Sequence, residues 1–104
     1  MVRTAVLVSG DGTNLQAIIN AHNYGKIKNC HLAAVISSKP NAFALTRARN
    51  AGIPTFVVNY ANFTSRHAFN EAILEKLRSL DIELVVMAGF LVVLGSPVLE
   101  AYEN

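Results

Sequence analysis

The residues best suited to bind a ligand lie in the stretch SGDGTNLQ, which begins at Ser9. Gly10 and Gly12 allow the backbone to turn sharply and to approach a ligand closely. The amides that follow open a helical pattern, where unpaired N–H groups and the helix dipole favour an anion. Thr13 and Asn14 add a hydroxyl and an amide that can donate to phosphate oxygens. The spacing predicts a phosphate-binding loop; the alternative is a plain strand-to-helix turn with Thr13 as the helix cap.

The kind of phosphate is narrowed by what surrounds this loop. No Gly-Lys-Ser/Thr follows, so the loop is not a Walker A motif, and Leu15 occupies the third glycine position of the dinucleotide fingerprint. No acidic residue ends the second predicted strand, as recognition of the NAD ribose requires. Ser37, Ser38 and Lys39 stand there instead and suit a 2′-phosphate, which leaves an NADP-binding module as an alternative. A mononucleotide-sized phosphate is the better match.

A loop of this kind must be held at the end of a strand, and strands and helices alternate along the chain. Short apolar runs bounded by glycine and polar residues predict strands over residues 4–8, 31–36, 55–58 and 84–88. Helical spacing of apolar residues follows the first three strands, at Leu15, Ile18, Ile19 and His22, at Phe43, Leu45 and Ala48, and at Phe69, Ile73, Leu77 and Leu80.

The predicted ends of these helices follow from capping residues. Gly25 and Gly52 are expected to end the first two helices, Asn41 to cap the second, and the segment ending at Ser65 to cap the third. A short fourth helix is expected to open at Ser96-Pro97.

Strands that are apolar on both faces belong to parallel sheets covered by helices on both sides. We therefore predict an α/β fold with three layers and a Rossmann-like parallel sheet of strand order 3-2-1-4. Ligands bind such sheets at the carboxyl ends of the strands, where the strand order reverses, here between the first and fourth strands. Those ends carry residues 9–14 and 89–94, which the topology should bring to one crevice.

Composition limits the class of protein. The 104 residues suffice for one small domain, and 52% hydrophobic with 15% charged residues indicate a folded chain. A net charge of +2 without a basic stripe gives no reason to expect a nucleic-acid partner. The longest apolar run, residues 84–94, is shorter than the ~20 residues that span a bilayer. We expect a cytoplasmic protein with small-molecule substrates and no membrane partner.

The remaining reactive side chains give no second site. Cys30 is the single cysteine, so it forms no disulfide within the chain and has no metal-ligand spacing; it is expected to be an inert thiol. His22, His31 and His67 lie far from the crevice in sequence and are expected to be structural or solvated. We predict no metal site.

Four stretches of the chain are familiar together: AVLVSGDGTNLQAII, NAFALTRARNAGIPT, SRHAFNEAIL and LVVMAGFLVVL. They resemble the N-terminal half of glycinamide ribonucleotide (phosphoribosylglycinamide) formyltransferase, a family of purine biosynthesis. The resemblance covers essentially the whole chain. It implies transfer of the formyl group from 10-formyltetrahydrofolate to the amine of glycinamide ribonucleotide.

The resemblance also implies binding residues. The substrate phosphate would be held by Gly12, Thr13 and Asn14, and the folate by Arg66 and the backbone of Leu91, Val92, Val93 and Leu94. The family commonly has Met-Arg-Ile-Leu at these last four positions, so a contact from the arginine side chain is lost here. Ser38 replaces an asparagine that is common after the second strand.

The family's catalytic asparagine, histidine and aspartate lie beyond Asn104, so we expect no catalytic residue in this chain and no activity from it alone. Residues 1–104 would be the N-terminal, nucleotide-binding part of the domain. The fourth strand, apolar on both faces, would be an edge of a four-stranded sheet, and such edges promote aggregation. We therefore expect more sheet beyond Asn104, a covering chain or a second copy at this edge. The alternative is a complete, non-catalytic phosphate- or nucleotide-binding module.

Overall fold

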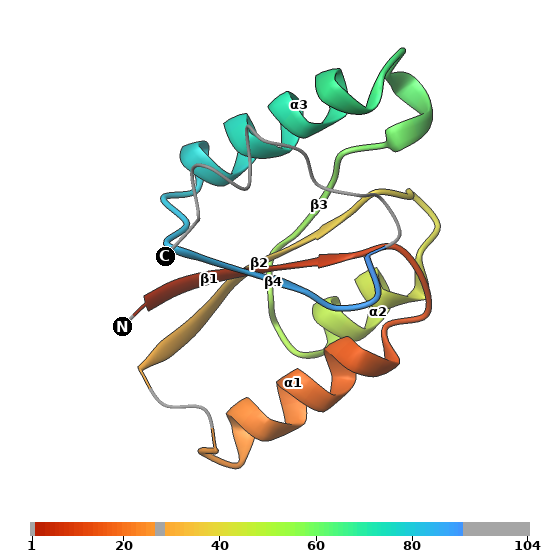
Figure 1. Cartoon of the computed structure of the whole chain (residues 1–104). Helices are drawn as coiled ribbons and strands as arrows, with labels where there is room; N and C mark the ends of the chain where they lie inside the picture. The colour runs from red at the N-terminus through yellow and green to blue at the C-terminus, as the bar shows by residue number, and fades with distance from the viewer. Residues whose placement is uncertain (1, 27–28, 91–104) are drawn as a thin grey trace.

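The computed structural model describes residues 2–26 and 29–90 and contains a four-stranded parallel sheet of order β3-β2-β1-β4 (Figure 1). The strands are β1 (Val2–Val8), β2 (Cys30–Ser37), β3 (Thr55–Val57) and β4 (Leu84–Met87). The helices are α1 (Thr13–Asn23), α2 (Phe43–Asn50), α3 (Arg66–Ser79) and the 3-10 helix η1 (Tyr60–Asn62). The predicted strand order is confirmed. The short helix expected at Ser96-Pro97 lies outside the described residues.

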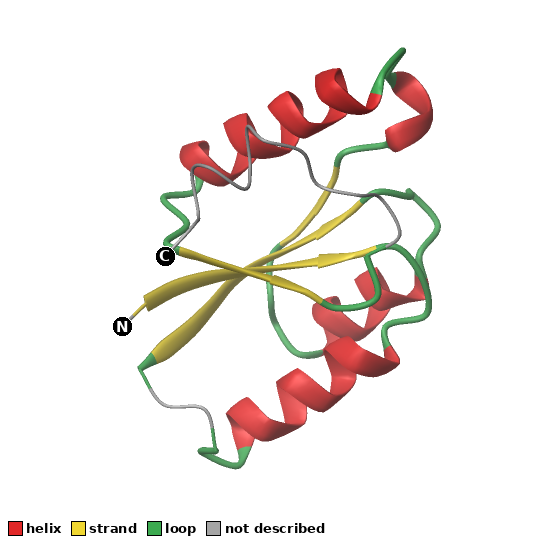
Figure 2. Cartoon of the chain, in the orientation of Figure 1, coloured by secondary structure: helices red, strands yellow, loops and turns green. Residues whose placement is uncertain are grey.

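The helices cover the sheet from two sides, with α1 and α2 on one face and α3 on the other (Figure 2). The alternation of β1 shows how the sequence fills both layers. Val6 and Val8 pack with Leu15 of α1, whereas Leu7 packs with Phe69 of α3, and all five side chains are fully buried. Burying a side chain of this size contributes about 1.5–3 kcal/mol, so both layers stabilise the central strand. The predicted three-layer architecture is confirmed.

The pairing of β1 with β2 contains one irregularity. Thr4 faces Leu32, but Ala5 faces Ala34, so Ala33 is an extra residue in β2. Ala33 and Ala34 consequently both pack in the cluster on the α3 side, while Leu32 packs on the α1 and α2 side. A bulge of this kind lets β2 keep apolar residues on both faces although its alternation is interrupted.

The helix ends follow the predicted capping residues with one exception. Gly25 (φ +74°) and Gly52 (φ +74°) follow α1 and α2 in the left-handed conformation. The Ser65 side chain accepts a 3.1 Å hydrogen bond from the amide of Ala68 and caps α3. Asn41 was expected to cap α2, but this prediction is wrong.

The N-cap of α2 is Ala42, which makes no side-chain cap bond. A capping side chain would accept a hydrogen bond from the amide of Ala44. That amide donates instead to the carbonyl of Gly10 at 3.2 Å. The loop after β1 thus takes the place of a side-chain cap for α2.

Candidate functional site

The loop SGDGTN follows β1 directly and leads into α1. Ser9 is buried, and its Oγ lies 2.6 Å from Oγ of Ser38 at the end of β2. Gly12 is the N-cap of α1 and adopts a left-handed conformation with φ 83° and ψ 23°. The loop is therefore a tight strand-to-helix turn at the carboxyl end of the central strand, and Gly12, not Thr13, occupies the cap position.

Gly12 is required at its position for two reasons. Its positive φ disfavours any residue with a Cβ. A Cβ built on it would also lie 2.7 Å from both Cα and Cβ of Ala44 and 3.0 Å from Cδ of Arg47. The loop backbone thus rests on α2 at a distance that only glycine permits.

The polar side chains of the loop are partly used within it. Asp11 Oδ1 accepts hydrogen bonds from the amide of Thr13 at 3.1 Å and from its hydroxyl at 3.3 Å. This Asx-type turn satisfies a donor of the first turn of α1. Thr13 and Asn14 are both exposed at the start of the helix.

Helix α2 contacts the loop through a side chain that the sequence did not single out. Arg47 Nε donates to the carbonyl of Asp11 at 2.7 Å, and its Nη1 lies 3.4 Å from Oε1 of Gln16 in α1. Arg47 is 36 positions from Asp11, so no local spacing could have revealed the pair. The two-residue spacing of Asp11 and Thr13, in contrast, was a readable signal for the turn.

The end of β4 meets the same loop, as the strand order requires. The amide of Ala88 donates to the carbonyl of Leu7 at 2.9 Å, and a Cβ on Gly89 would lie 3.8 Å from Nδ2 of Asn14. The expected convergence of the two strand ends is confirmed as far as Gly89. Leu91, Val92, Val93 and Leu94, the residues expected to bind folate, lie outside the described residues.

Arg66 is the first residue of α3 and is exposed. Helix α3 begins at the carboxyl-end side of the sheet but covers the opposite face from α1 (Figure 1). The backbone carbonyl of Arg66 accepts a 2.8 Å hydrogen bond from Nδ2 of Asn70, one turn later on α3. The structure therefore places Arg66 at the expected end of the molecule and on the other side of the sheet from Gly12.

The residues that favoured an NADP site are engaged in the fold. Ser37 Oγ donates to the carbonyl of Lys39 at 2.6 Å and accepts from its amide at 3.0 Å. Ser38 is buried against Ser9. Neither hydroxyl is directed to an open pocket, which weakens the case for a 2′-phosphate there.

The histidines and the cysteine have structural or solvent-exposed positions. His22 Nε2 lies 2.9 Å from the carbonyl of Cys30, whose Sγ donates to Thr4 Oγ1 at 3.1 Å. His31 is exposed, and the exposed His67 lies 2.9 Å from Glu71 on the surface of α3. Within residues 2–26 and 29–90, no three His, Cys, Asp or Glu side chains form a group that could hold a metal. Over the same residues, no helix has the length and apolar character needed to cross a membrane.

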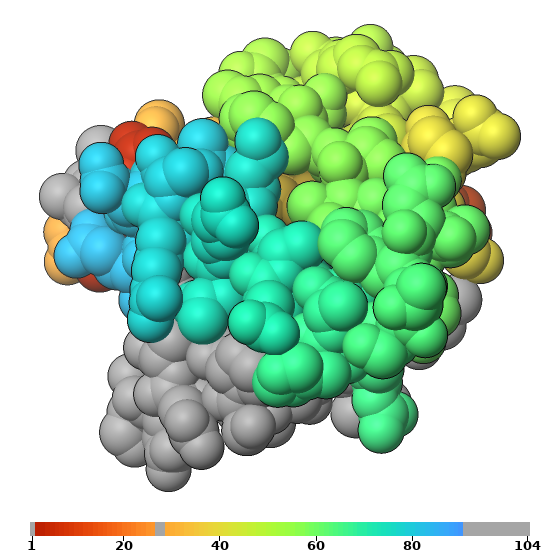
Figure 3. Space-filling model, turned by 90° about the horizontal axis from the view of Figure 1, so that it is seen from above, coloured from red at the N-terminus to blue at the C-terminus, as the bar shows by residue number. Residues whose placement is uncertain are grey.

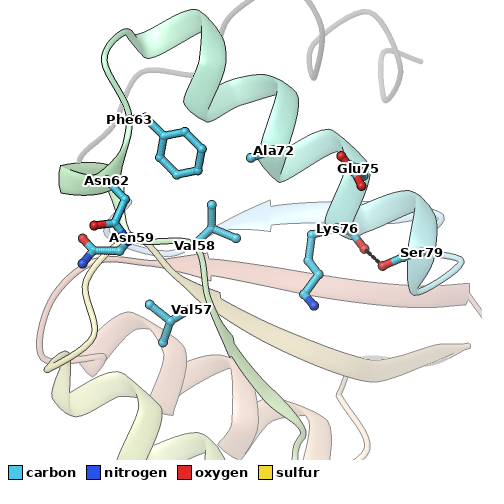
Figure 4. A pocket seen from close by; sticks show the side chains of 9 residues that line it. All are labelled: Val57, Val58, Asn59, Asn62, Phe63, Ala72, Glu75, Lys76 and Ser79. Atoms are coloured by element: carbon cyan, nitrogen blue, oxygen red, sulfur yellow. Dashed lines mark hydrogen bonds between the residues drawn. The ribbon is translucent and has the colours of Figure 1, made fainter.

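A surface groove of about 440 Å³ lies between β3 and α3, away from the glycine loop (Figures 3 and 4). Three of its polar side chains, those of Asn59, Lys76 and Ser79, have contacts within the fold. Lys76 Nζ lies 4.5 Å from the centre of the Phe56 ring, and Ser79 donates to the carbonyl of Lys76 at 2.7 Å. Asn59 accepts from the amide of Ala61 at 3.1 Å.

Comparison with known proteins points to one family. The family model described as formyl transferase matches residues 2–104. Phosphoribosylglycinamide formyltransferase of Haemophilus influenzae is 44% identical over 94 residues, which cover 90% of this chain and 44% of that protein. The Escherichia coli K12 protein of the same name is 41% identical over 97 residues, covering 93% of this chain and 45% of the relative.

Solved structures agree with the sequence relatives. Glycinamide ribonucleotide transformylase 1 from Symbiobacterium toebii superposes with a TM-score of 0.92 at 40% identity, covering 100% of this chain and 49% of that chain. This chain therefore spans less than half the length of each of these three proteins.

Proposed function

Because this chain belongs to the formyl transferase family, we propose that it is the N-terminal, nucleotide-binding part of a phosphoribosylglycinamide formyltransferase. The intact enzyme would transfer a formyl group from 10-formyltetrahydrofolate to the amine of glycinamide ribonucleotide. The observation that carries this proposal is the loop at the end of β1, where a buried, left-handed Gly12 opens α1 beside Gly89. Relatives named for this activity match the chain over nine-tenths or more of its length.

Gly12, Thr13 and Asn14 would hold the substrate phosphate. Three features support this role: the first turn of an 11-residue helix, an exposed hydroxyl and an exposed side-chain amide. Helix N-termini favour anions through their unpaired N–H groups and dipole, which suits a phosphate dianion. Asp11 adds a negative charge next to this site. Its carboxylate accepts hydrogen bonds from the amide and the hydroxyl of Thr13 within the turn.

The folate side of the proposal depends on the resemblance to the family. Arg66 and the backbone of Leu91, Val92, Val93 and Leu94 would bind the 10-formyltetrahydrofolate. The position of Arg66 at the carboxyl-end side of the sheet is compatible with that role (Figure 1). Val92 stands where the family commonly has arginine, so the contact of that side chain would be absent.

The proposed enzyme needs polypeptide in addition to the part that the structure describes. Leu84 and Val86 of β4 face the side of α1, and together with Ile18 they line an apolar hollow of about 290 Å³. Apolar surface of this kind on an edge strand is normally covered. We propose that the sheet continues past β4, through more of the same chain, a separate chain or a second copy.

The chain alone is proposed to be inactive, since the catalytic groups of the family are expected beyond Asn104. The location expected from the sequence, the cytoplasm, stays a prediction.

The test is a formyl-transfer assay with purified protein, glycinamide ribonucleotide and 10-formyltetrahydrofolate. We expect no transfer by the 104-residue chain, and transfer when it is co-expressed with the part of the Escherichia coli relative that follows the matched region. Transfer by the chain alone would show that the catalytic groups are already present.

A binding titration separates the competing functions. The chain should bind glycinamide ribonucleotide and not NADPH, and Asn14→Ala should weaken the binding because it removes an exposed donor at the loop. Binding of NADPH instead would favour the NADP-binding module. Binding of the ribonucleotide with no transfer in any combination would favour the non-catalytic module.

A further inference from the structure

Arg47 contacts the loop SGDGTN from helix α2 through its guanidinium group. Arg47 of α2 donates through Nε to the carbonyl of Asp11 at 2.7 Å and places Nη1 3.4 Å from Gln16 Oε1. Its guanidinium carbon lies 5.1 Å from the centre of the Phe43 ring, one turn earlier on the same helix. Arg47 is half-buried, so these contacts hold its guanidinium in one place between α2 and the loop.

The hydrogen bond to the Asp11 carbonyl determines where the next amide points. The peptide bonds of the described residues are trans, and in a trans peptide the C=O and the N–H of one unit point in opposite directions. Since the Asp11 carbonyl is drawn toward Arg47 on α2, the amide of Gly12 is turned away from α2. The carbonyl of Gly10 accepts from the amide of Ala44, which turns the amide of Asp11 away from α2 in the same manner.

Two consecutive amides therefore point to the side of the loop that α2 does not cover. Successive N–H groups presented together form an anion-binding concavity, and their strength depends on being fixed before the ligand arrives. The Ala44 contact is made by the backbone and would survive most substitutions. The Arg47 contact is made by a side chain and can be removed.

We propose that Arg47 is a positioning residue: it fixes the Asp11–Gly12 peptide from α2 and thereby sets the affinity of the loop for a phosphate monoester. The affinity part of this proposal rests on the proposed function of the loop. Arg47 acts through the Asp11 carbonyl and not by contact with the phosphate.

The first measurement is amide hydrogen exchange of the ligand-free 104-residue chain, with Arg47→Ala compared with wild type. We expect exchange at Thr13 and Ala44, whose amides donate to Asp11 Oδ1 and to the Gly10 carbonyl, to become roughly tenfold faster, because a hydrogen bond that restrains the loop is lost. Exchange in β1 should be unchanged. Arg49→Ala is the matched control, since Arg49 is an exposed arginine on the same helix. Unchanged exchange in the loop of Arg47→Ala would overturn the proposal.

The second measurement is an NMR titration with ribose 5-phosphate, with ribose as the control ligand that lacks the phosphate. We expect the dissociation constant of Arg47→Ala to rise roughly tenfold and that of Arg49→Ala to stay within about twofold. Arg47→Lys keeps the charge but has a single donor group that cannot bridge Asp11 and Gln16. It should recover only part of the affinity and leave the exchange fast.

The outcomes separate the possible failures. If Arg47→Lys binds as tightly as wild type while its loop exchanges fast, Arg47 acts by charge alone and the positioning role is wrong. If wild type does not bind ribose 5-phosphate, the proposed phosphate site is wrong, and exchange in Arg47→Ala still decides whether Arg47 fixes the loop.

Discussion

At the scale of single residues, position 12 is the clearest case of a residue type that the structure requires. Gly12→Ala should lower the free energy of unfolding by about 2–5 kcal/mol, which combines the cost of a left-handed alanine with that of a crowded Cβ. The crowding comes from Ala44, whose Cα would lie 2.7 Å from the new atom. The midpoint of urea unfolding measures the change.

Two other glycines separate these contributions. Gly52 has φ +74° but open space around a Cβ, so Gly52→Ala should cost only about 1–2 kcal/mol. Gly10 also has open space and is not among the glycines with positive φ, so Gly10→Ala should change stability by less than about 0.5 kcal/mol. Equal destabilisation by Gly12→Ala and Gly52→Ala would mean that α2 shifts to accommodate the added Cβ, so that crowding adds no cost.

The glycine loop also shows which site residues a sequence can reveal. Gly10 has neither a positive φ nor a crowded Cβ position, so its backbone does not require glycine. Gly12 was readable because a turn between a strand and a helix favours glycine. Arg47 was not, because its contact with Asp11 joins residues 36 positions apart. In the sequence, Arg47 resembles the exposed Arg49, which follows two positions later on α2. Only the packing of α2 against the loop distinguishes the two arginines.

At the scale of elements, the cap of α3 is the contact most open to a simple test. Ser65→Ala removes the hydrogen bond that the Ser65 side chain accepts from the amide of Ala68, and should cost about 1 kcal/mol of unfolding free energy. Ser79→Ala is the control at the other end of α3. There the exposed Ser79 hydroxyl donates to the backbone carbonyl of Lys76. Because alanine is the better helix former there, that change should be within about 0.5 kcal/mol of neutral. Equal effects of the two variants would contradict the capping role.

The two caps also show where prediction from local sequence succeeds. Ser65 lies in an exposed loop before α3, where only local groups compete for the first amides of the helix. Asn41 failed as a cap because the amide of Ala44 bonds to Gly10, a residue on another strand end. Strand and helix types were predictable from apolar periodicity, while this boundary depended on a neighbour distant in sequence. The bulge at Ala33 was likewise not visible from the pattern.

At the scale of the whole molecule, β4 should control self-association. Leu84 is 40% exposed and Met87 56% exposed, on a strand whose outer edge has no partner among the described strands. The 104-residue chain should therefore associate with rising concentration, and Leu84→Lys or Met87→Lys should shift it toward the monomer, since lysine on an edge opposes strand addition. Sedimentation velocity at several concentrations measures this.

Tyr24→Lys is the control for that experiment, because Tyr24 is 80% exposed at the end of α1 and not on β4. It should leave the association unchanged. A wild-type chain that sediments as a monomer at every concentration would argue that the β4 edge needs no cover.

The central place of β1 in the sheet has a consequence for synthesis. Of the described strands β1 is made first, and it pairs on one side with β4. The amide of Arg3 donates to the side chain of Glu83, 80 positions later. At about 5–20 residues per second, a ribosome takes about 4–16 seconds to add those residues. During that interval β1 can pair with β2 but must keep its other edge open. The nascent chain thus holds this central strand paired on one side only until synthesis has passed Met87.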